Sequence, residues 1–124
     1  MAVINLEEIR KPVGNTGAEL GAVDLGGFSI VAHRIPRGLD YTELLRAACG
    51  AVLCRVAHYL VVTRGTLGVE YTSGTRELVH AGEVAYTPPG HTIRAIDDLE
   101  MAEISPADGN RFLMARISAT GLFG

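Results

Sequence analysis

Apolar and polar residues alternate along the middle of the chain, and this pattern predicts a run of short β-strands. Residues 52–63 place one set of side chains on a single face: Val52, Cys54, Val56, His58, Leu60 and Val62. Further strands are predicted over residues 66–72, 76–80 and 83–87, because a glycine-containing dipeptide breaks the pattern between each pair. We expect this central stretch to form the body of a small β-barrel.

A proline-rich corner, Pro88-Pro89-Gly90, ends the central stretch. Prolines lack the amide hydrogen that a sheet ladder needs, so the corner marks a rim where one strand ends and the chain reverses. His91 and Ile93 then share one face of the next predicted strand. Flanking strands are predicted at residues 28–35 and 99–104. The second of these places three residues on one face: Leu99, Met101 and Glu103.

Several segments are harder to assign. Residues 1–10 fit either a short helix or an edge strand, and residues 111–118 fit either a last strand or a C-terminal helix. Residues 42–48 have the composition of a short helix on propensity alone. Residues 105–110 are predicted to form a loop, and the glycine-studded segment 13–27 has too few consecutive apolar residues for a core of its own.

The composition fits one packed domain of 124 residues. Hydrophobic residues make up 48% of the chain and charged residues 20%, which argues against disorder and for a surface that is partly apolar or paired in an oligomer. The net charge of -3 does not indicate the positively charged surface that binds nucleic acid, so nucleic acid is not an expected partner. Without an apolar run of about 18 residues or a signal-peptide pattern, we expect no membrane association and a soluble cytoplasmic protein.

Two spacings in the central stretch resemble the sequence motifs of the cupin superfamily. Gly82-(x5)-Pro88-x-Gly90 resembles the second cupin motif, and His58-(x6)-Gly65 resembles the end of the first. Cys54-(x3)-His58 together with Pro88-Pro89-Gly90-His91 resembles small single-domain bacterial cupins. The resemblance covers residues 28–105. It implies an all-β fold, the cupin-type double-stranded β-helix or jelly-roll barrel, with or without a short terminal helix.

The same resemblance implies how the chain is divided. A cupin β-barrel is expected over residues 28–124. Residues 1–27 are expected to form an N-terminal arm that packs as a strand on a neighbouring subunit, so the resemblance implies a homodimer; a flexible surface arm is the alternative. Against the helix propensity of residues 42–48, the resemblance favours an extended segment that leads into the barrel.

Metal-binding cupins take two histidines and a glutamate from the first motif and a third histidine from the second. The positions that correspond here are Val52, Cys54, His58 and Ile93. Two of these residues are aliphatic, so the usual site cannot be carried over. A reduced constellation remains, made of Cys54, His58 and His91, which lies two residues before Ile93 and on the same face.

Cys54 and His58 can bind the same ion only if the strand between them is not straight. On a straight strand Cys54 and His58 lie about 13 Å apart, at about 3.3 Å per residue, which is too far for one ion. A shared site therefore requires the strand to bend between Arg55 and Ala57. A thiolate with imidazoles suits a divalent transition metal: zinc, iron, nickel or manganese. The alternatives are that Cys54 is a small core residue, His58 a hydrogen-bonded core histidine, and His91 a solvated loop histidine.

His58 is the predicted catalytic residue, as a general base or as a metal ligand, because a neutral imidazole serves both roles. Four residues are candidates for binding a small organic substrate, although ordinary surface or barrel positions would explain them as well: Tyr59, Tyr71, Arg64 and Arg94. His33 and His80 are expected to lie away from the site.

Two functions remain open. An isomerase, cyclase or lyase fits an apolar pocket with few titratable groups better than redox chemistry, which needs a fuller metal shell. The alternative is a barrel without metal that binds or senses a small molecule and catalyses nothing, since fold alone does not separate the two.

Overall fold

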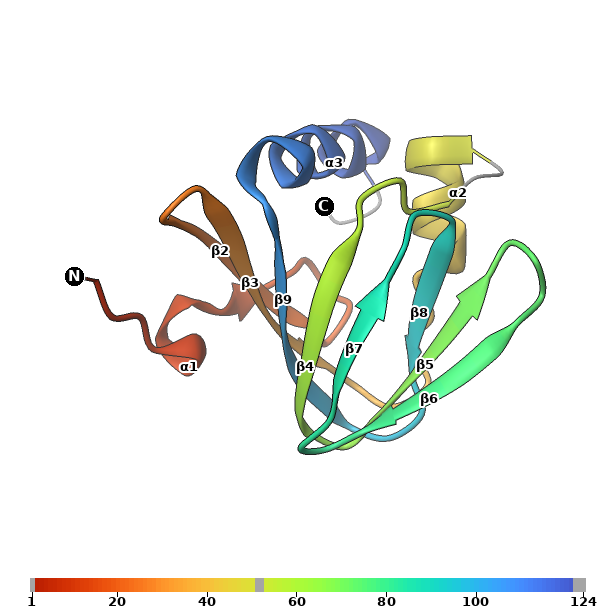
Figure 1. Ribbon diagram of the computed structural model, residues 1–124, viewed down its shortest axis with the longest axis horizontal. Helices are drawn as coiled ribbons and strands as arrows, with labels where there is room; N and C mark the ends of the chain where they lie inside the picture. Colours follow the sequence, from red (N-terminus) through yellow and green to blue (C-terminus); the bar gives the residue numbers. More distant parts are fainter. Residues whose placement is uncertain (1, 51–52, 122–124) are drawn as a thin grey trace.

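A computed structural model describes residues 2–50 and 53–121 and shows two antiparallel β-sheets that face each other (Figure 1). The larger sheet has six strands in the order β1-β2-β3-β9-β4-β7, and the smaller has three in the order β6-β5-β8. The strands are β1 (Lys11–Pro12), β2 (Glu19–Leu25), β3 (Phe28–Ile35), β4 (His58–Arg64), β5 (Thr66–Tyr71), β6 (Arg76–His80), β7 (Val84–Thr87), β8 (His91–Ala95) and β9 (Leu99–Pro106). The helices are α1 (Leu6–Ile9), α2 (Thr42–Cys49) and α3 (Ala107–Thr120). The mostly β architecture confirms the predicted fold class.

The core lies between the two sheets, where strand alternation points the apolar side chains inward. Four of its aliphatic side chains are at most 1% exposed: Ile35, Leu60, Leu67 and Leu99. Strands β3 and β6 begin and end at the predicted residues. None of the described helices has both the length and the apolar character needed to cross a bilayer.

Helix α2 corrects the prediction that residues 42–48 are extended. Its buried side chains lie at helical spacing: Leu44, Leu45, Ala48 and Cys49. At the start of the helix Asp40 accepts hydrogen bonds from the backbone amide and the hydroxyl of Thr42, at 2.8 and 2.5 Å. Local helix propensity and the tertiary environment therefore favour the same structure, and the resemblance misled the prediction.

Helix α3 corrects the loop predicted at residues 105–110 and decides the ambiguity at residues 111–118. Ser105 is buried opposite Ser29 in the ladder between β3 and β9, so β9 continues to Pro106 and the helix begins directly after it. The buried side chains of α3 again have helical spacing: Ala107, Asn110, Leu113 and Ile117.

Within residues 1–10 the structure has the short helix α1, one of the two predicted alternatives, and the short edge strand β1 follows directly after this segment. Residues 19–25, predicted as part of an arm, form β2 and pair along their whole length with β3 of the same chain. The predicted tail at Leu122 and Phe123 lies outside the described residues.

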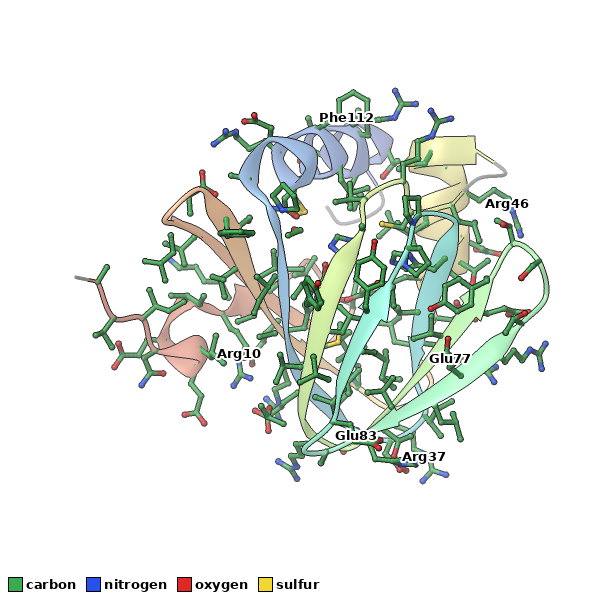
Figure 2. All side chains as sticks on the ribbon, viewed as in Figure 1. Arg10, Arg37, Arg46, Glu77, Glu83 and Phe112 are labelled. Carbon is green, nitrogen blue, oxygen red and sulfur yellow. The ribbon has the colours of Figure 1, made fainter. Side chains whose placement is uncertain are left out.

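Helices α2 and α3 lie together over one end of the sheets, at the top of Figure 1. Arg116 of α3 joins the two helices, because its Nε donates a hydrogen bond to the carbonyl oxygen of Ala48 at 2.5 Å. The opposite side of α3 faces solvent, as Phe112 shows by pointing away from the molecule (Figure 2). The two helices therefore form a roof over the interior at this end.

Gly65, between β4 and β5, occupies a corner that only glycine fits. Its φ is +80°, and a Cβ there would collide with the carbonyl oxygen of Asp98. Gly74 in the β5–β6 turn has a similar φ of +90°, but open space surrounds it. Gly65→Ala is expected to lower the free energy of unfolding by about 3 kcal/mol and Gly74→Ala by about 1 kcal/mol, since only the first adds a clash to the backbone strain. Urea denaturation measures both; equal losses would show that the close approach to Asp98 costs nothing.

Candidate metal centre

The chain bends sharply just before β4, and this bend forms the site. The strand predicted over residues 52–63 begins only at His58, after a bend at Val56. Leu53 has a left-handed φ of 63°, which is uncommon for a residue other than glycine and reverses the chain before Cys54. The Sγ atom of Cys54 consequently lies 3.1 Å from Nε2 of His58. The predicted bend between Arg55 and Ala57 is therefore confirmed. Val52, predicted on the same strand face, lies outside the described residues.

The proline corner brings His91 to the same place. Cys54 and His91 form an antiparallel bridge, in which the Cys54 amide donates to the His91 carbonyl at 3.0 Å and the Gly90 amide donates to the Cys54 carbonyl at 2.7 Å. The Nδ1 atom of His91 lies 2.7 Å from the carbonyl oxygen of Pro88. A carbonyl oxygen only accepts hydrogen bonds, so Nδ1 carries the proton and Nε2 keeps its lone pair.

Cys54, His58 and His91 form one compact buried group. Each offers a donor atom, and these atoms all lie within 4.8 Å of one another. The three residues are only 2–3% exposed, and the rings of His58 and His91 meet edge to face with centroids 5.3 Å apart. In a tetrahedral zinc site a sulfur and a nitrogen ligand lie about 3.5 Å apart, so the observed separations suit one shared ion.

Glu103, on β9, lies behind His58. One carboxylate oxygen, Oε2, is 3.3 Å from Nδ1 of His58, and the other, Oε1, is 2.5 Å from Nε2 of His33. Burial alone would raise the pKa of Glu103, but the nearby imidazoles of His58 and His33 outweigh it and lower that pKa to about 2. The carboxylate is therefore ionised at neutral pH, between two imidazoles in the interior.

The Glu103 carboxylate favours one tautomer of the neutral His58 ring. The 3.3 Å approach to Glu103 is not aligned as a linear hydrogen bond, so charge attraction is its main contribution. An ionised carboxylate favours the proton on the nearer nitrogen, Nδ1, and leaves the Nε2 lone pair directed at Cys54. Carboxylates commonly hold metal-binding histidines from behind in this way.

The other two candidate metal ligands, His91 and Cys54, are uncharged at neutral pH. Burial lowers the pKa of His91, which keeps its imidazole neutral. Burial also raises the pKa of the Cys54 thiol to about 12, so the thiol holds its proton until a cation displaces it. A neutral imidazole and a thiol that ionises only on metal binding are groups that a transition metal ion can use as ligands.

The group opens onto a cavity of about 50 Å³ between the sheets and the two roof helices. Most of its walls are apolar: Leu20, Val31, Leu44, Leu45, Leu60, Ile93, Leu113, Met114 and Ile117. Besides the donor group, its polar lining is His33, Tyr41, Glu103 and Asn110. A carboxylate and several imidazoles therefore lie beside apolar walls that exclude water. This arrangement suits proton transfer on a small bound molecule.

The predicted substrate-binding residues lie in different places. The ring of Tyr71 lies beside that of His91, with centroids 6.4 Å apart, whereas Tyr59 points out from the sheet and is 54% exposed. Arg64 and Arg94 are exposed and do not line the cavity. Arg64 instead approaches Glu100 at 3.7 Å.

Two cavity residues were not predicted from the sequence. His33, expected to lie away from the site, lines the cavity and contacts Glu103; His80 is exposed as expected. Glu103 was not singled out either, although the pattern of residues 99–104 carries a signal for it. A carboxylate that shares a strand face with Leu99 and Met101 must be buried, and a buried carboxylate needs partners.

Solved structures with this arrangement of strands are numerous. A RmlC-like cupin protein from Desulfovibrio desulfuricans superposes with a TM-score of 0.59 at 19% identity, over 86% of this chain and 97% of the other. A cupin-2 domain protein from Shewanella frigidimarina gives 0.55 at 14% identity, over 84% and 94%. The chain has the cupin fold.

The cupin fold is shared as well with the ectoine synthase of P. lautus, at a TM-score of 0.59 and 19% identity over 86% of this chain and 78% of that one. No family model matches the sequence. No curated protein matches it either. In this chain Ile93 lines the cavity without a donor atom, and His91 supplies the imidazole from two residues earlier.

Proposed function

We propose that this cupin holds one divalent transition metal ion with Cys54, His58 and His91 and acts on a small organic molecule in the adjoining cavity. The reaction we propose is an isomerisation, cyclisation or elimination. The observation that carries the proposal is the buried group of three donor atoms within 4.8 Å of one another, backed by Glu103. Three protein ligands leave a fourth tetrahedral position for water or substrate, as catalytic rather than structural zinc sites do.

The bound ion would supply Lewis-acid polarisation of a carbonyl or hydroxyl oxygen. The side chains of the protein would supply proton transfer and the exclusion of water. Glu103 and His33 lie 2.5 Å apart and can pass a proton between Oε1 and Nε2 beside the cavity. The apolar walls exclude water, which would otherwise compete for a reactive intermediate.

His33 provides a separate reason to expect a ligand. Its Nδ1 is buried and has no hydrogen-bond partner within residues 2–50 and 53–121, although the side chain lines the cavity. Buried polar atoms are rarely left unpaired, because each costs about 1–3 kcal/mol. A polar atom of a bound molecule would satisfy this nitrogen.

Elemental analysis combined with ligand screening tests the proposal. The protein is purified without chelator after growth with added zinc, iron, nickel and manganese, and about one metal ion per chain is expected. Small hydroxy, keto and amino compounds are then screened by thermal shift with the loaded and the chelator-treated protein, and the bound compounds are followed by NMR for turnover. Metal-dependent binding with product formation is expected.

A second function, a metal-free binding or sensory barrel, is supported by the same unpaired nitrogen of His33. It predicts ligands that bind equally well after chelation and stay unchanged in the NMR spectrum. Those results together with metal-free protein would overturn the enzyme proposal.

A further inference from the structure

Two buried polar side chains line the cavity in addition to the three candidate metal ligands and Glu103. Asn110, in the first turn of α3, is 4% exposed, and His33, on β3, is 3% exposed. Each keeps part of its hydrogen-bonding capacity for a partner that residues 2–50 and 53–121 do not supply. Because unpaired polar atoms are rare in protein interiors, these two side chains indicate where a bound molecule makes its polar contacts.

The amide of Asn110 is held in place by Ser29. Its Nδ2 donates a hydrogen bond at 2.8 Å to Oγ of Ser29, which is buried on the inner face of β3. Among the described residues this is the one side-chain hydrogen bond that Asn110 makes. A primary amide has two N–H donors and a carbonyl acceptor, so one N–H and the carbonyl oxygen of Asn110 remain for a molecule in the cavity.

His33 presents a hydrogen-bond acceptor to the same cavity. Oε1 of Glu103 lies 2.5 Å from Nε2 of His33, and an ionised carboxylate only accepts hydrogen bonds. The proton of the neutral His33 ring therefore lies on Nε2, and the buried Nδ1 has a lone pair. A bound molecule needs a hydrogen-bond donor to pair with this nitrogen or with the carbonyl oxygen of Asn110.

The charges around the cavity disfavour an anion. Glu103 is the one carboxylate in the lining, and neither lysine nor arginine lines the cavity among the described residues. A carboxylate on the bound molecule would add a second buried negative charge with no basic side chain to pair with, which is costly between apolar walls. A cation has little to gain, because Glu103 already lies between the imidazoles of His33 and His58.

The size of the cavity limits what can enter. One water molecule needs about 10–15 Å³ of cavity volume, so about 50 Å³ admits about four non-hydrogen atoms without movement of the walls. A larger substrate can place only its reacting group here. The group that enters is therefore small, uncharged and able to donate a hydrogen bond.

We propose that the cavity selects an uncharged group that has both a hydrogen-bond donor and a carbonyl oxygen, as a primary carboxamide has, and that Asn110 determines this specificity. The inference rests on the proposed function in one respect, since it takes the same cavity as the substrate site. It does not depend on the metal ion. The donor of the bound group pairs with Asn110 or His33, and its carbonyl oxygen accepts the free N–H of Asn110.

Four probe molecules of equal size separate the effect of charge from that of hydrogen bonding. Acetamide, acetate, acetone and acetamidinium each have four non-hydrogen atoms, but only acetamide is uncharged and has both a donor and an acceptor. Dissociation constants are measured by NMR titration of the chelator-treated full chain, so that no metal ion can bind acetate directly. Molecules this small bind with constants on the order of millimolar. Acetamide is expected to bind at least about tenfold more tightly than each of the others.

Asn110→Leu removes the amide and keeps a side chain of similar size. It should weaken acetamide binding at least about tenfold and leave acetone binding within about twofold, and the acetone result also shows that the cavity is intact. The double substitution Ser29→Ala with Asn110→Leu is the second variant, because it leaves no unpaired hydroxyl at Ser29 if the single variant folds poorly. Asn15→Leu, at an exposed loop asparagine, is the matched control and should change none of the four constants.

Three results would overturn this specificity. The first is acetate, acetone or acetamidinium binding as tightly as acetamide, and the second is no acetamide binding at about 100 mM. The third is acetamide binding to a folded Asn110→Leu chain as tightly as to the wild type. Metal uptake is a separate result: a chain that prefers acetamide but takes up no metal would overturn the metal enzyme proposed above and leave the specificity of the cavity standing.

Discussion

Replacing His58 with alanine is expected to lower the affinity for zinc at least about 100-fold. The substitution removes one of three donor atoms from the buried group, and losing even an outer partner of a metal ligand usually costs 10- to 100-fold. Competition with a chromophoric chelator measures the affinity, and elemental analysis of the purified variant gives its metal content. The variant should also lose every metal-dependent ligand found by thermal shift.

His80→Ala is the control for this experiment. His80 lies exposed on β6, and its only described side-chain partner is the hydroxyl of Thr66 at 3.4 Å. Its loss should leave the metal affinity within twofold of the wild type. Equal zinc affinity in His58→Ala and wild-type protein, with both folded, would show that the ion binds elsewhere or not at all.

Glu103→Gln is expected to lower the stability of the metal-free protein by about 3 kcal/mol at pH 7. The carboxylate lies between two buried imidazoles, and the substitution would leave buried ring nitrogens without their acceptor, which costs about 1–3 kcal/mol for each. An amide keeps the shape but cannot attract the protons on His33 and His58. Thermal or urea unfolding measures the loss, and the exposed substitution Glu43→Gln should leave stability within about 0.5 kcal/mol of wild type.

The pH dependence of stability separates a charge effect from a packing effect. In the folded protein the pKa of Glu103 is about 2, against 4.5 for an ordinary glutamate, so on acidification the unfolded chain binds this proton first. The stabilisation is therefore fully present above about pH 4.5 and is lost as the pH falls towards 2. Glu103→Gln should lack this part of the acid loss. Parallel pH profiles for the variant and the wild type would contradict an ionised carboxylate at this position.

The sequence was informative where a side chain's environment follows from strand alternation. The alternation of residues 52–63 was predicted to place one set of side chains on a single face, and the described members of that set are all buried: Cys54, Val56, His58, Leu60 and Val62. The same alternation placed His91 and Ile93 together, and both line the cavity. The turn-forming glycines also allowed the ends of the central strands to be predicted.

Other parts of the fold depend on tertiary packing that no local pattern contains. The segment 42–48 has helix propensity, but only the roof over the cavity explains why Leu44 and Leu45 are buried. His33 and Glu103 stand 70 positions apart in the sequence, and only the ladder between β3 and β9 makes them neighbours. A search for buried polar residues on apolar strand faces would have marked both.

The main-chain bridge between Cys54 and His91 has a consequence for how such a site changes over evolutionary time. Both of its hydrogen bonds join backbone atoms, so neither depends on which side chain stands at either position. A single codon change at position 54 can exchange sulfur for nitrogen or oxygen while the loop keeps its course. Because soft and hard donors select different ions, such an exchange would change the preference of the proposed metal site in one step, without rebuilding the scaffold.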